Sequence, residues 1–541
     1  MAKFLPPSRY AVFILCFVVM LIAFGVGLMG EKKGLFVGVP FAALVLVGLW
    51  DLGQPRHSIR RNYPVTGHIR WWVEMVRPEI RQYLIEADEE AAPFSRDQRA
   101  LVYQRAKGDA GEHPFGTLLD AYRDGYEFIG HSTMPATPAD PASFRITIGG
   151  PDCTAPYSAS VFNISAMSFG ALSANAIRAL NAGAKKGGFS HDTGEGSLSP
   201  YHQEMGGDIV WELGSGYFGC RTDDGHFDPD KFVEHARLEQ VKMIEIKLSQ
   251  GAKPGHGGVL PAAKVSPEIA ATRGVPMGQD CISPSRHTAF STPLELMAFI
   301  VRLRELSGGK PVGFKLCLGH PWEFMCMVKA MLKSGVTPDF IVVDGTEGGT
   351  GAAPTEFSDH VGVPMREGLL FVHNTLVGAG LRDKIKVGVA GKIVSAFDIV
   401  SVLAIGADWA NAARGFMFAV GCVQSRSCNT NRCPTGVATQ DALRQKALVV
   451  PDKAERVYNF HRLTLRGLSD MLAAAGLEHP DEVKPHHLAR RVSATEIKLF
   501  SELHTFLEPG SLLDGSAPSG LYADHWRRAS ETTFAPSATS A

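Results

Sequence analysis

Three cysteines lie in one short stretch of the chain, and thiols at such close spacing can bind a metal. Residues 421–440 read GCVQSRSCNTNRCPTGVATQ, in which Cys422, Cys428 and Cys433 form a C-x5-C-x4-C pattern that Pro434 follows directly. Three thiolates can supply one ligand to each iron of a three-iron cluster, whereas a tetrahedral zinc site would require a fourth ligand. Taken alone, the pattern is equally compatible with three thiols in an apolar core.

Polar and glycine-rich loops follow a series of apolar runs, where they could bind an anionic cofactor. Lys315 lies within one run, and a lysine there could stabilise the anionic reduced ring of a flavin. Gly391-Lys392 and Arg414-Gly415 end the last two runs and are typical of a phosphate site, because backbone N–H groups and a guanidinium fork both donate to phosphate oxygens. Each loop alone could be a simple turn, but together they favour a flavin mononucleotide (FMN) site.

The elements that must position these loops alternate between strand-like and helical patterns. The predicted strands are 161–166, 189–192, 243–248, 280–283, 312–316, 340–344, 386–390 and 408–412. Because the runs are continuously apolar, they are typical of parallel strands covered on both faces. Helices are predicted at 321–334, at 396–405 and after a capping sequence at 292–295. We therefore predict an α/β fold, a (β/α)8 TIM barrel rather than an open doubly wound sheet, with its chemistry at the carboxyl ends of the strands.

Two apolar runs, Tyr10–Met29 and Leu35–Trp50, precede this region. The first would be about 30 Å long as a helix, which matches the hydrocarbon core of a bilayer. A two-helix transmembrane hairpin is predicted, with two buried helices of a soluble domain as the alternative. Arginines such as Arg56 and Arg60 follow the hairpin, so both its ends, and the catalytic domain with them, are expected on the cytoplasmic side of the cell inner membrane.

Four segments are predicted along the chain. They are a transmembrane hairpin at 1–52, a helical preface at 53–150, the barrel with the cysteine loop at 151–490, and a carboxyl-terminal tail at 491–541. Within the preface, helices are predicted at 95–107 and 115–128.

Charge and motifs exclude some partners. The net charge of −1 gives no general attraction to nucleic acid. Residues 25–30 match the dinucleotide pattern GxGxxG, but they lie inside an apolar run and follow no strand, so they do not predict a nicotinamide site. Electrons are therefore expected from a partner.

Several motifs together resemble the FMN-binding synthase domain of glutamate synthases, over about residues 150–490. The motifs are Met167-Ser168-Phe169-Gly170-Ala171, Thr193-Gly194-Glu195-Gly196, Gln250-Gly251-Ala252-Lys253-Pro254-Gly255, Gly348-Gly349-Thr350-Gly351-Ala352 and Cys433-Pro434-Thr435-Gly436-Val437-Ala438-Thr439-Gln440. The resemblance implies that Met167, Ser168, Thr193, Lys315 and Arg414 bind FMN. It also implies that Cys422, Cys428 and Cys433 ligate a [3Fe–4S] cluster.

The resemblance also implies a reaction, the reductive amination of 2-oxoglutarate or a related oxo acid with ammonia, using electrons relayed through the cluster to FMN. Gln250 and Lys253 are then placed to bind substrate carboxylates. Glu195 would handle a proton or position the imine, with a cap inside its own loop as the alternative role. Arg286 adds a guanidinium that we expect near the substrate.

Departures from the family leave alternatives open. The amidotransferase and β-helix domains of full-length glutamate synthases are not recognised, so ammonia is expected from solution or from a separate amidotransferase subunit. Electrons are expected from a donor protein or a membrane quinol. His256 and Arg286 replace family residues, which leaves an activity like that of N-methylglutamate synthase, or another amino acid dehydrogenase, open. A membrane electron-transfer subunit and a non-catalytic scaffold are further alternatives, and intact Lys315, Gln250 and Lys253 speak against the scaffold.

Overall fold

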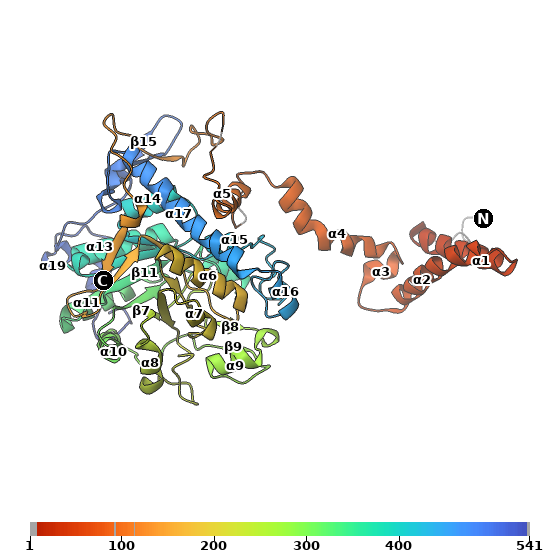
Figure 1. Cartoon of the computed structure of the whole chain (residues 1–541), viewed down its shortest axis with the longest axis horizontal. Helices are drawn as coiled ribbons and strands as arrows, with labels where there is room; N and C mark the ends of the chain where they lie inside the picture. Colours follow the sequence, from red (N-terminus) through yellow and green to blue (C-terminus); the bar gives the residue numbers. More distant parts are fainter. Residues whose placement is uncertain (1–7, 91–92, 113, 538–541) are drawn as a thin grey trace. The chain divides into compact units, whose positions relative to one another are not determined.

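A computed structural model describes residues 8–90, 93–112 and 114–537 (Figure 1). The chain divides into two compact units, Met1–Glu90 and Ala91–Ala541. The predicted boundary after residue 52 falls within the first unit, and the one after residue 150 falls within the second. Parts of the predicted hairpin and tail, residues 1–7 and 538–541, lie outside the described residues.

The first unit is built from helices. They are α1 (Ala11–Leu28), α2 (Lys33–Gly53), α3 (Ser58–Asn62), α4 (Gly67–Ile80) and a π-helical turn at Arg81–Ile85. Two spans of 21 residues each, Ser8–Leu28 and Lys33–Gly53, are long and apolar enough to cross a membrane. α1 and α2 pack closely, because a Cβ on Gly34 would lie 2.5 Å from the backbone oxygen of Ala23. The buried carboxylate of Asp51 then accepts from Val65 N at 3.0 Å and lies 2.8 Å from His68 Nε2, which ties the following segment to α2.

The second unit contains a closed barrel of eight parallel strands, as predicted. In barrel order they are β4 (Phe162–Ile164), β5 (His191–Asp192), β6 (Ile209–Leu213), β7 (Val241–Lys247), β10 (Val312–Leu316), β11 (Phe340–Asp344), β12 (Lys386–Ala390) and β13 (Trp409–Ala412). Apolar side chains on these strands, such as Val210 and Val342, fill one end of the barrel interior together with a hairpin formed by β2 (Arg145–Ile148) and β3 (Tyr157–Ser160).

One predicted strand was placed wrongly. Residues 280–283 do not join the barrel, because β9 (Cys281–Ile282) pairs antiparallel with β8 (Val259–Leu260) within the long excursion between β7 and β10. The third barrel strand is instead β6, which the sequence did not reveal because a charged residue, Glu212, interrupts its apolar run.

Helices surround the barrel. They are α6 (Ala174–Gly187), α7 (Pro200–Glu204), α8 (Pro229–Ala236), α9 (Pro267–Arg273), α10 (Pro293–Leu306), α11 (Pro321–Ser334), α12 (Thr355–His360), α13 (Met365–Gly378), α14 (Ala396–Ala404), α15 (Arg414–Ala419), α16 (Ala442–Lys446) and α17 (Val450–Ala474). The predicted helices at 321–334 and 396–405 are confirmed to within a residue. The capping sequence is confirmed too: Thr292 Oγ1 accepts from Glu295 N at 3.2 Å, and the Glu295 carboxylate accepts from Thr292 N at 3.1 Å.

The segment before the barrel contains one of the two predicted helices. α5 (Arg96–Ala106) begins with a capping box between Ser95 and Gln98. The helix predicted at 115–128 is wrong, since the described residues 114–126 form turns, with positive φ values of +104° at Gly116 and +85° at Gly125 that interrupt any helix.

A small antiparallel sheet joins distant parts of the second unit. β1 (Glu127–Ile129) pairs with β14 (Leu488–Arg491), which pairs with β15 (Ile497–Leu499). The Glu127 carboxylate accepts from Arg366 at 2.9 Å and from Arg490 at 2.8 Å.

Beyond this sheet the chain forms α18 (Phe500–Leu503), α19 (Ser511–Asp514) and α20 (Ala523–Arg528). Tyr522 stacks on Phe371 with 5.6 Å between ring centroids, so the final helices pack against the outer helices of the barrel.

Candidate active site and cofactor cavity

A cavity of about 370 Å³ opens at the carboxyl ends of the barrel strands, where parallel barrels place their chemistry. All eight strands contribute to its wall, seven through the loops that follow them and β10 through Lys315 on the strand itself. The predicted site residues that line it are Met167, Ser168, Glu195, Gln250, Lys253, Lys315, Gly391, Lys392, Arg414, Cys422 and Cys428. The backbone positions them closely: Gly194 has a φ of +62°, and a Cβ there would lie 2.8 Å from Ser168 N.

Three predicted site residues do not line this cavity. The Thr193 side chain is fully buried, where its hydroxyl donates to Gly194 O at 2.9 Å and accepts from Glu212 N at 3.1 Å. Arg286 is exposed in the excursion that contains β8 and β9. Cys433 is buried and does not line the cavity.

Lys315 is a buried cation on β10, surrounded by carboxylates that the sequence did not reveal. Its ammonium is ion-paired with Glu212 and lies 3.3 Å from Glu245 Oε1. Burial alone would lower the pKa of Lys315, but Glu212 and Glu245 raise it well above its ordinary value. Oxygens of Asp192, Glu212 and Glu245 lie within 4.8 Å of one another, and burial together with Glu212 raises the pKa of Asp192 to about 7. The ammonium of Lys315 is thus held as a fixed positive charge at the cavity wall.

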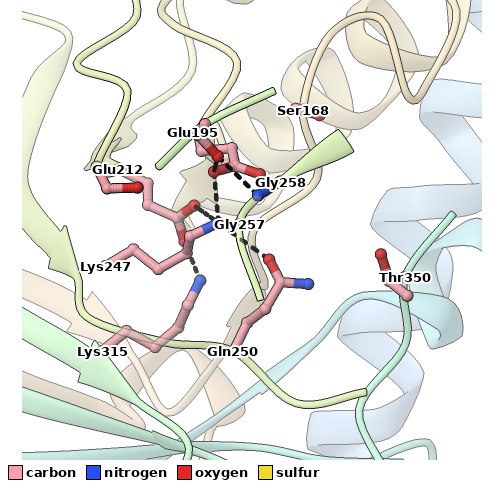
Figure 2. Close-up of polar contacts among 12 residues, drawn as sticks. Ser168, Glu195, Glu212, Lys247, Gln250, Gly257, Gly258, Lys315 and Thr350 are labelled. Atoms are coloured by element: carbon pink, nitrogen blue, oxygen red, sulfur yellow. Dashed lines mark hydrogen bonds and ion pairs between the residues drawn. The ribbon is translucent and has the colours of Figure 1, made fainter. Parts of the chain in front are cut away.

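Glu195 and Gln250 meet at a second buried cation, Lys247 (Figure 2). Lys247 Nζ lies 2.7 Å from Glu195 Oε2 and donates to Gln250 Oε1 at 3.0 Å. Burial would raise the pKa of Glu195, but the contact with Lys247, together with the charges of Lys253 and Arg273, outweighs it and lowers that pKa to about 2. Glu195 is therefore an ionised hydrogen-bond acceptor at neutral pH.

Other cations line the same part of the cavity. Lys253 is buried, and desolvation lowers its pKa from the ordinary value. Arg273, which the sequence did not single out, donates to Phe169 O at 2.9 Å and also lines the cavity. The ionised carboxylate of Glu195 thus lies near three cations, Lys247, Lys253 and Arg273. This polarity suits an anionic substrate that also carries an N–H group.

The residues after β12 and β13 fit a phosphate group. Arg414 donates to Glu347 O at 2.6 Å, and its guanidinium lies 4.7 Å from the ring centroid of Phe94. Among the described residues, neither Arg414 nor Lys392 has a carboxylate within ion-pair distance. A Cβ on Gly349 would lie 2.8 Å from Arg414 Nε, so the backbone passes close to this cation. Backbone and guanidinium donors close together are what a phosphate requires.

The cysteine loop borders the same cavity. Tyr103 OH donates to Cys422 O at 2.7 Å, and the buried ammonium of Lys264 donates to Cys428 O at 3.3 Å. Burial raises the pKa of Cys422 to about 12, whereas hydrogen bonds to Ala438 and Thr435 lower the pKa of Cys433 despite its burial.

All three thiols are free, and their Sγ atoms do not all lie within 4.8 Å of one another. Among the described residues, the only group of three or more Cys, His, Asp or Glu side chains with ligand atoms all within 4.8 Å is the one around Lys315. Three spaced thiols fit a cluster in which each binds a different iron better than they fit a single zinc ion.

Known proteins are similar to this chain. Residues 153–478 match the family described as "Conserved region in glutamate synthase". The glutamate synthase large subunit-like protein YerD of Bacillus subtilis is 38% identical over 531 residues, which cover 91% of this chain and 99% of that protein. An archaeal-type glutamate synthase [NADPH] of Dehalococcoides mccartyi is 32% identical over 340 residues, and the match spans 62% of this chain and 64% of that relative. Among solved structures, a mandelate oxidase mutant with an FMN adduct aligns at 16% identity and a TM-score of 0.38, covering 74% of this chain and 91% of that one.

Proposed function

Because the chain belongs to the glutamate synthase family, we propose that it is an oxidoreductase that reductively aminates 2-oxoglutarate, or a related oxo acid, to the amino acid. Bound FMN would supply the hydride, and a [3Fe–4S] cluster held by Cys422, Cys428 and Cys433 would supply its electrons. Arg414, Lys392 and Gly391 would hold the phosphate, with Met167, Ser168 and Lys315 around the rest of the cofactor. Thr193, which does not line the cavity, would act through its hydrogen bond to Gly194 O.

The polarity of the cavity carries this proposal. An oxo acid presents carboxylate and carbonyl oxygens, and the cavity offers Lys253, Arg273 and Gln250 to bind them. Ammonia and the imine present N–H groups, and the ionised Glu195 can accept from them. These contacts would hold the imine carbon in a fixed place and exclude water from it.

Anaerobic reoxidation tests the proposal. The full chain is purified in detergent, its flavin is photoreduced, and 2-oxoglutarate and ammonium are then added. We expect the oxidised flavin spectrum to return and glutamate to form only when both are present. Methylammonium in place of ammonium tests for an activity like that of N-methylglutamate synthase. Failure of every oxo acid and amine pair to reoxidise the flavin would contradict the proposal and favour an electron-transfer subunit.

A matched pair of variants links the result to the cavity. Lys253→Met removes a cation of the cavity wall and should abolish reoxidation by the oxo acid. Lys242→Met makes the same change at the amino end of β7, where the side chain lies 3.8 Å from Asp208, and should leave the reaction unchanged.

The two apolar helices support a further part of the proposal, that the chain is anchored in the cell inner membrane with its barrel in the cytoplasm. Electrons would then come from a donor protein or a membrane quinol, and ammonia from solution or from a separate amidotransferase subunit. Alkaline carbonate should leave the chain in the membrane fraction, and release into the supernatant would contradict the anchor.

A further inference from the structure

Lys247 occupies the centre of the polar network at the cavity, although neither its type nor its spacing singled it out in the sequence. It is the last residue of β7, and its exposed fraction is 8%. Its ammonium contacts Glu195 on one side and Gln250 on the other, and Glu212 Oε1 lies 3.9 Å away (Figure 2). The side chain therefore joins β6, β7 and the loop after β5 through one charge.

The ammonium fixes which way Gln250 faces. A lysine ammonium only donates hydrogen bonds, so the atom of the carboxamide that meets it must be the oxygen. Figure 2 shows the amide nitrogen of Gln250 on the other side, toward Thr350. A flipped carboxamide would place its N–H groups against the ammonium. Gln250 therefore offers two donors and no acceptor to a ligand on that side.

The same ammonium pairs with Glu195 and, together with the charges of Lys253 and Arg273, keeps its carboxylate ionised. Glu195 Oε2 faces Lys247 Nζ at 2.7 Å and accepts from Ser283 Oγ at 3.3 Å. The other oxygen, Oε1, faces Gly258, where an added Cβ would lie only 2.0 Å away. Because one oxygen is held and the carboxylate is ionised, Glu195 can only accept a hydrogen bond from a ligand.

We propose that Lys247 is the positioning residue of the substrate site, which makes Gln250 a donor for a carboxylate or carbonyl oxygen and Glu195 an acceptor for an N–H group. This inference rests on the proposed function and deepens it. The site is selective for ligands that carry both an anionic oxygen group and an N–H at fixed separation. Lys247 does this without touching the substrate, through the two side chains that do.

Lys247→Met tests the effect on Glu195, because methionine fills similar space without the charge. Infrared difference spectra follow the protonated carboxyl band during a pH titration of the full chain. The double variant Lys247→Met/Glu195→Gln lacks the carboxyl group of Glu195, so the band that it loses is assigned to Glu195. We expect the proton affinity of Glu195 to rise by at least about tenfold, or one pKa unit, relative to the wild type. Lys242→Met is the matched control and should not shift the band. An unshifted Glu195 titration in a folded, flavin-containing Lys247→Met protein would overturn the proposal.

Gln250→Glu tests the orientation of the carboxamide and does not remove Lys247. Its carboxylate can keep the bond to the ammonium, but it replaces the donor that faces the ligand with a negatively charged oxygen. We expect glutarate, a dicarboxylate probe followed by perturbation of the flavin spectrum, to bind at least about tenfold more weakly, as the loss of a charge-assisted bond predicts. Unchanged glutarate affinity would overturn the assigned orientation.

The two proposals fail differently. A wild-type protein that no oxo acid and amine reoxidise would contradict the proposed function, while the infrared titration would still report on Lys247. If the wild type turns over and the Lys247→Met variant has the same Glu195 titration, KM and kcat as the wild type, the role of Lys247 is contradicted. The proposed function then still stands.

Discussion

Replacing Lys315 with methionine should destabilise the barrel in a pH-dependent way. The change removes the ammonium that pairs with Glu212 and Glu245 and leaves their carboxylates buried without it. Removing one partner of a buried ion pair costs roughly 3–5 kcal/mol. The second unit has about 450 residues, so its unfolding entropy is about 0.9 kcal/mol/K and the melting temperature should fall by about 3–5 °C at pH 8.

The direction of the pH dependence follows from the buried carboxyls. Burial and Glu212 raise the pKa of Asp192 from 3.8 to about 7 in the folded protein. Stability that comes from its protonation is therefore fully present below pH 3.8 and is lost as the pH rises through about 7. Burial and Asp192 also raise the pKa of Glu245 well above its ordinary value. Without Lys315 these values rise further, so the deficit of the variant should be smaller at pH 6 than at pH 8.

Differential scanning calorimetry of the wild type and Lys315→Met at the two pH values measures this, with Lys242→Met as the control for loss of a more exposed lysine. Bound flavin is quantified in parallel, because Lys315 lines the cofactor cavity. A melting temperature within about 1 °C of the wild type at pH 8, or a deficit that grows at pH 6, would refute the view that this ammonium stabilises the buried carboxylates.

Three further outcomes are expected. Cys428→Ala should lose iron and the electron paramagnetic resonance signal of the cluster while it retains flavin, and a variant with full iron content would discredit the cluster assignment. Gly258→Ala should reduce turnover at least about tenfold, because its Cβ would lie 2.0 Å from Glu195 Oε1 and displace that carboxylate, and unchanged turnover would speak against the placement of Glu195. Arg286→Ala should change the KM for the oxo acid by less than about twofold, since the side chain is exposed and outside the cavity, whereas a large increase would restore the assignment made from sequence.

The sequence predicted the barrel because continuous apolar runs and helix caps are local signals. Prediction from the sequence failed where the pairing of a strand depends on segments far away in the chain. β6 carries Glu212 into the barrel interior, where the ammonium groups of Lys315 and Lys247 compensate its buried carboxylate. Residues 280–283 form a strand, but its partner lies in the same excursion rather than in the barrel.

Prediction of the candidate active site from the sequence was also incomplete where contacts join distant segments. The resemblance to the glutamate synthase domain identified Glu195, Gln250 and Lys253, which the structure brings to one cavity. Lys247 was missed because its role depends on the ion pair with Glu195, which joins β7 to the loop after β5. No spacing in the sequence encodes that contact. Arg286 was expected near the substrate because it replaces a family residue; in the structure its side chain is exposed and does not line the cavity.

The pairing of β1 with β14 has a consequence for biosynthesis. Glu127 and Arg490, which meet in this sheet, are 363 positions apart. At roughly 5–20 residues per second, a ribosome would release the first strand roughly 20–70 s before its partner emerges. Throughout that interval the nascent polypeptide carries an open strand edge, of the kind to which chaperones bind and at which aggregation begins.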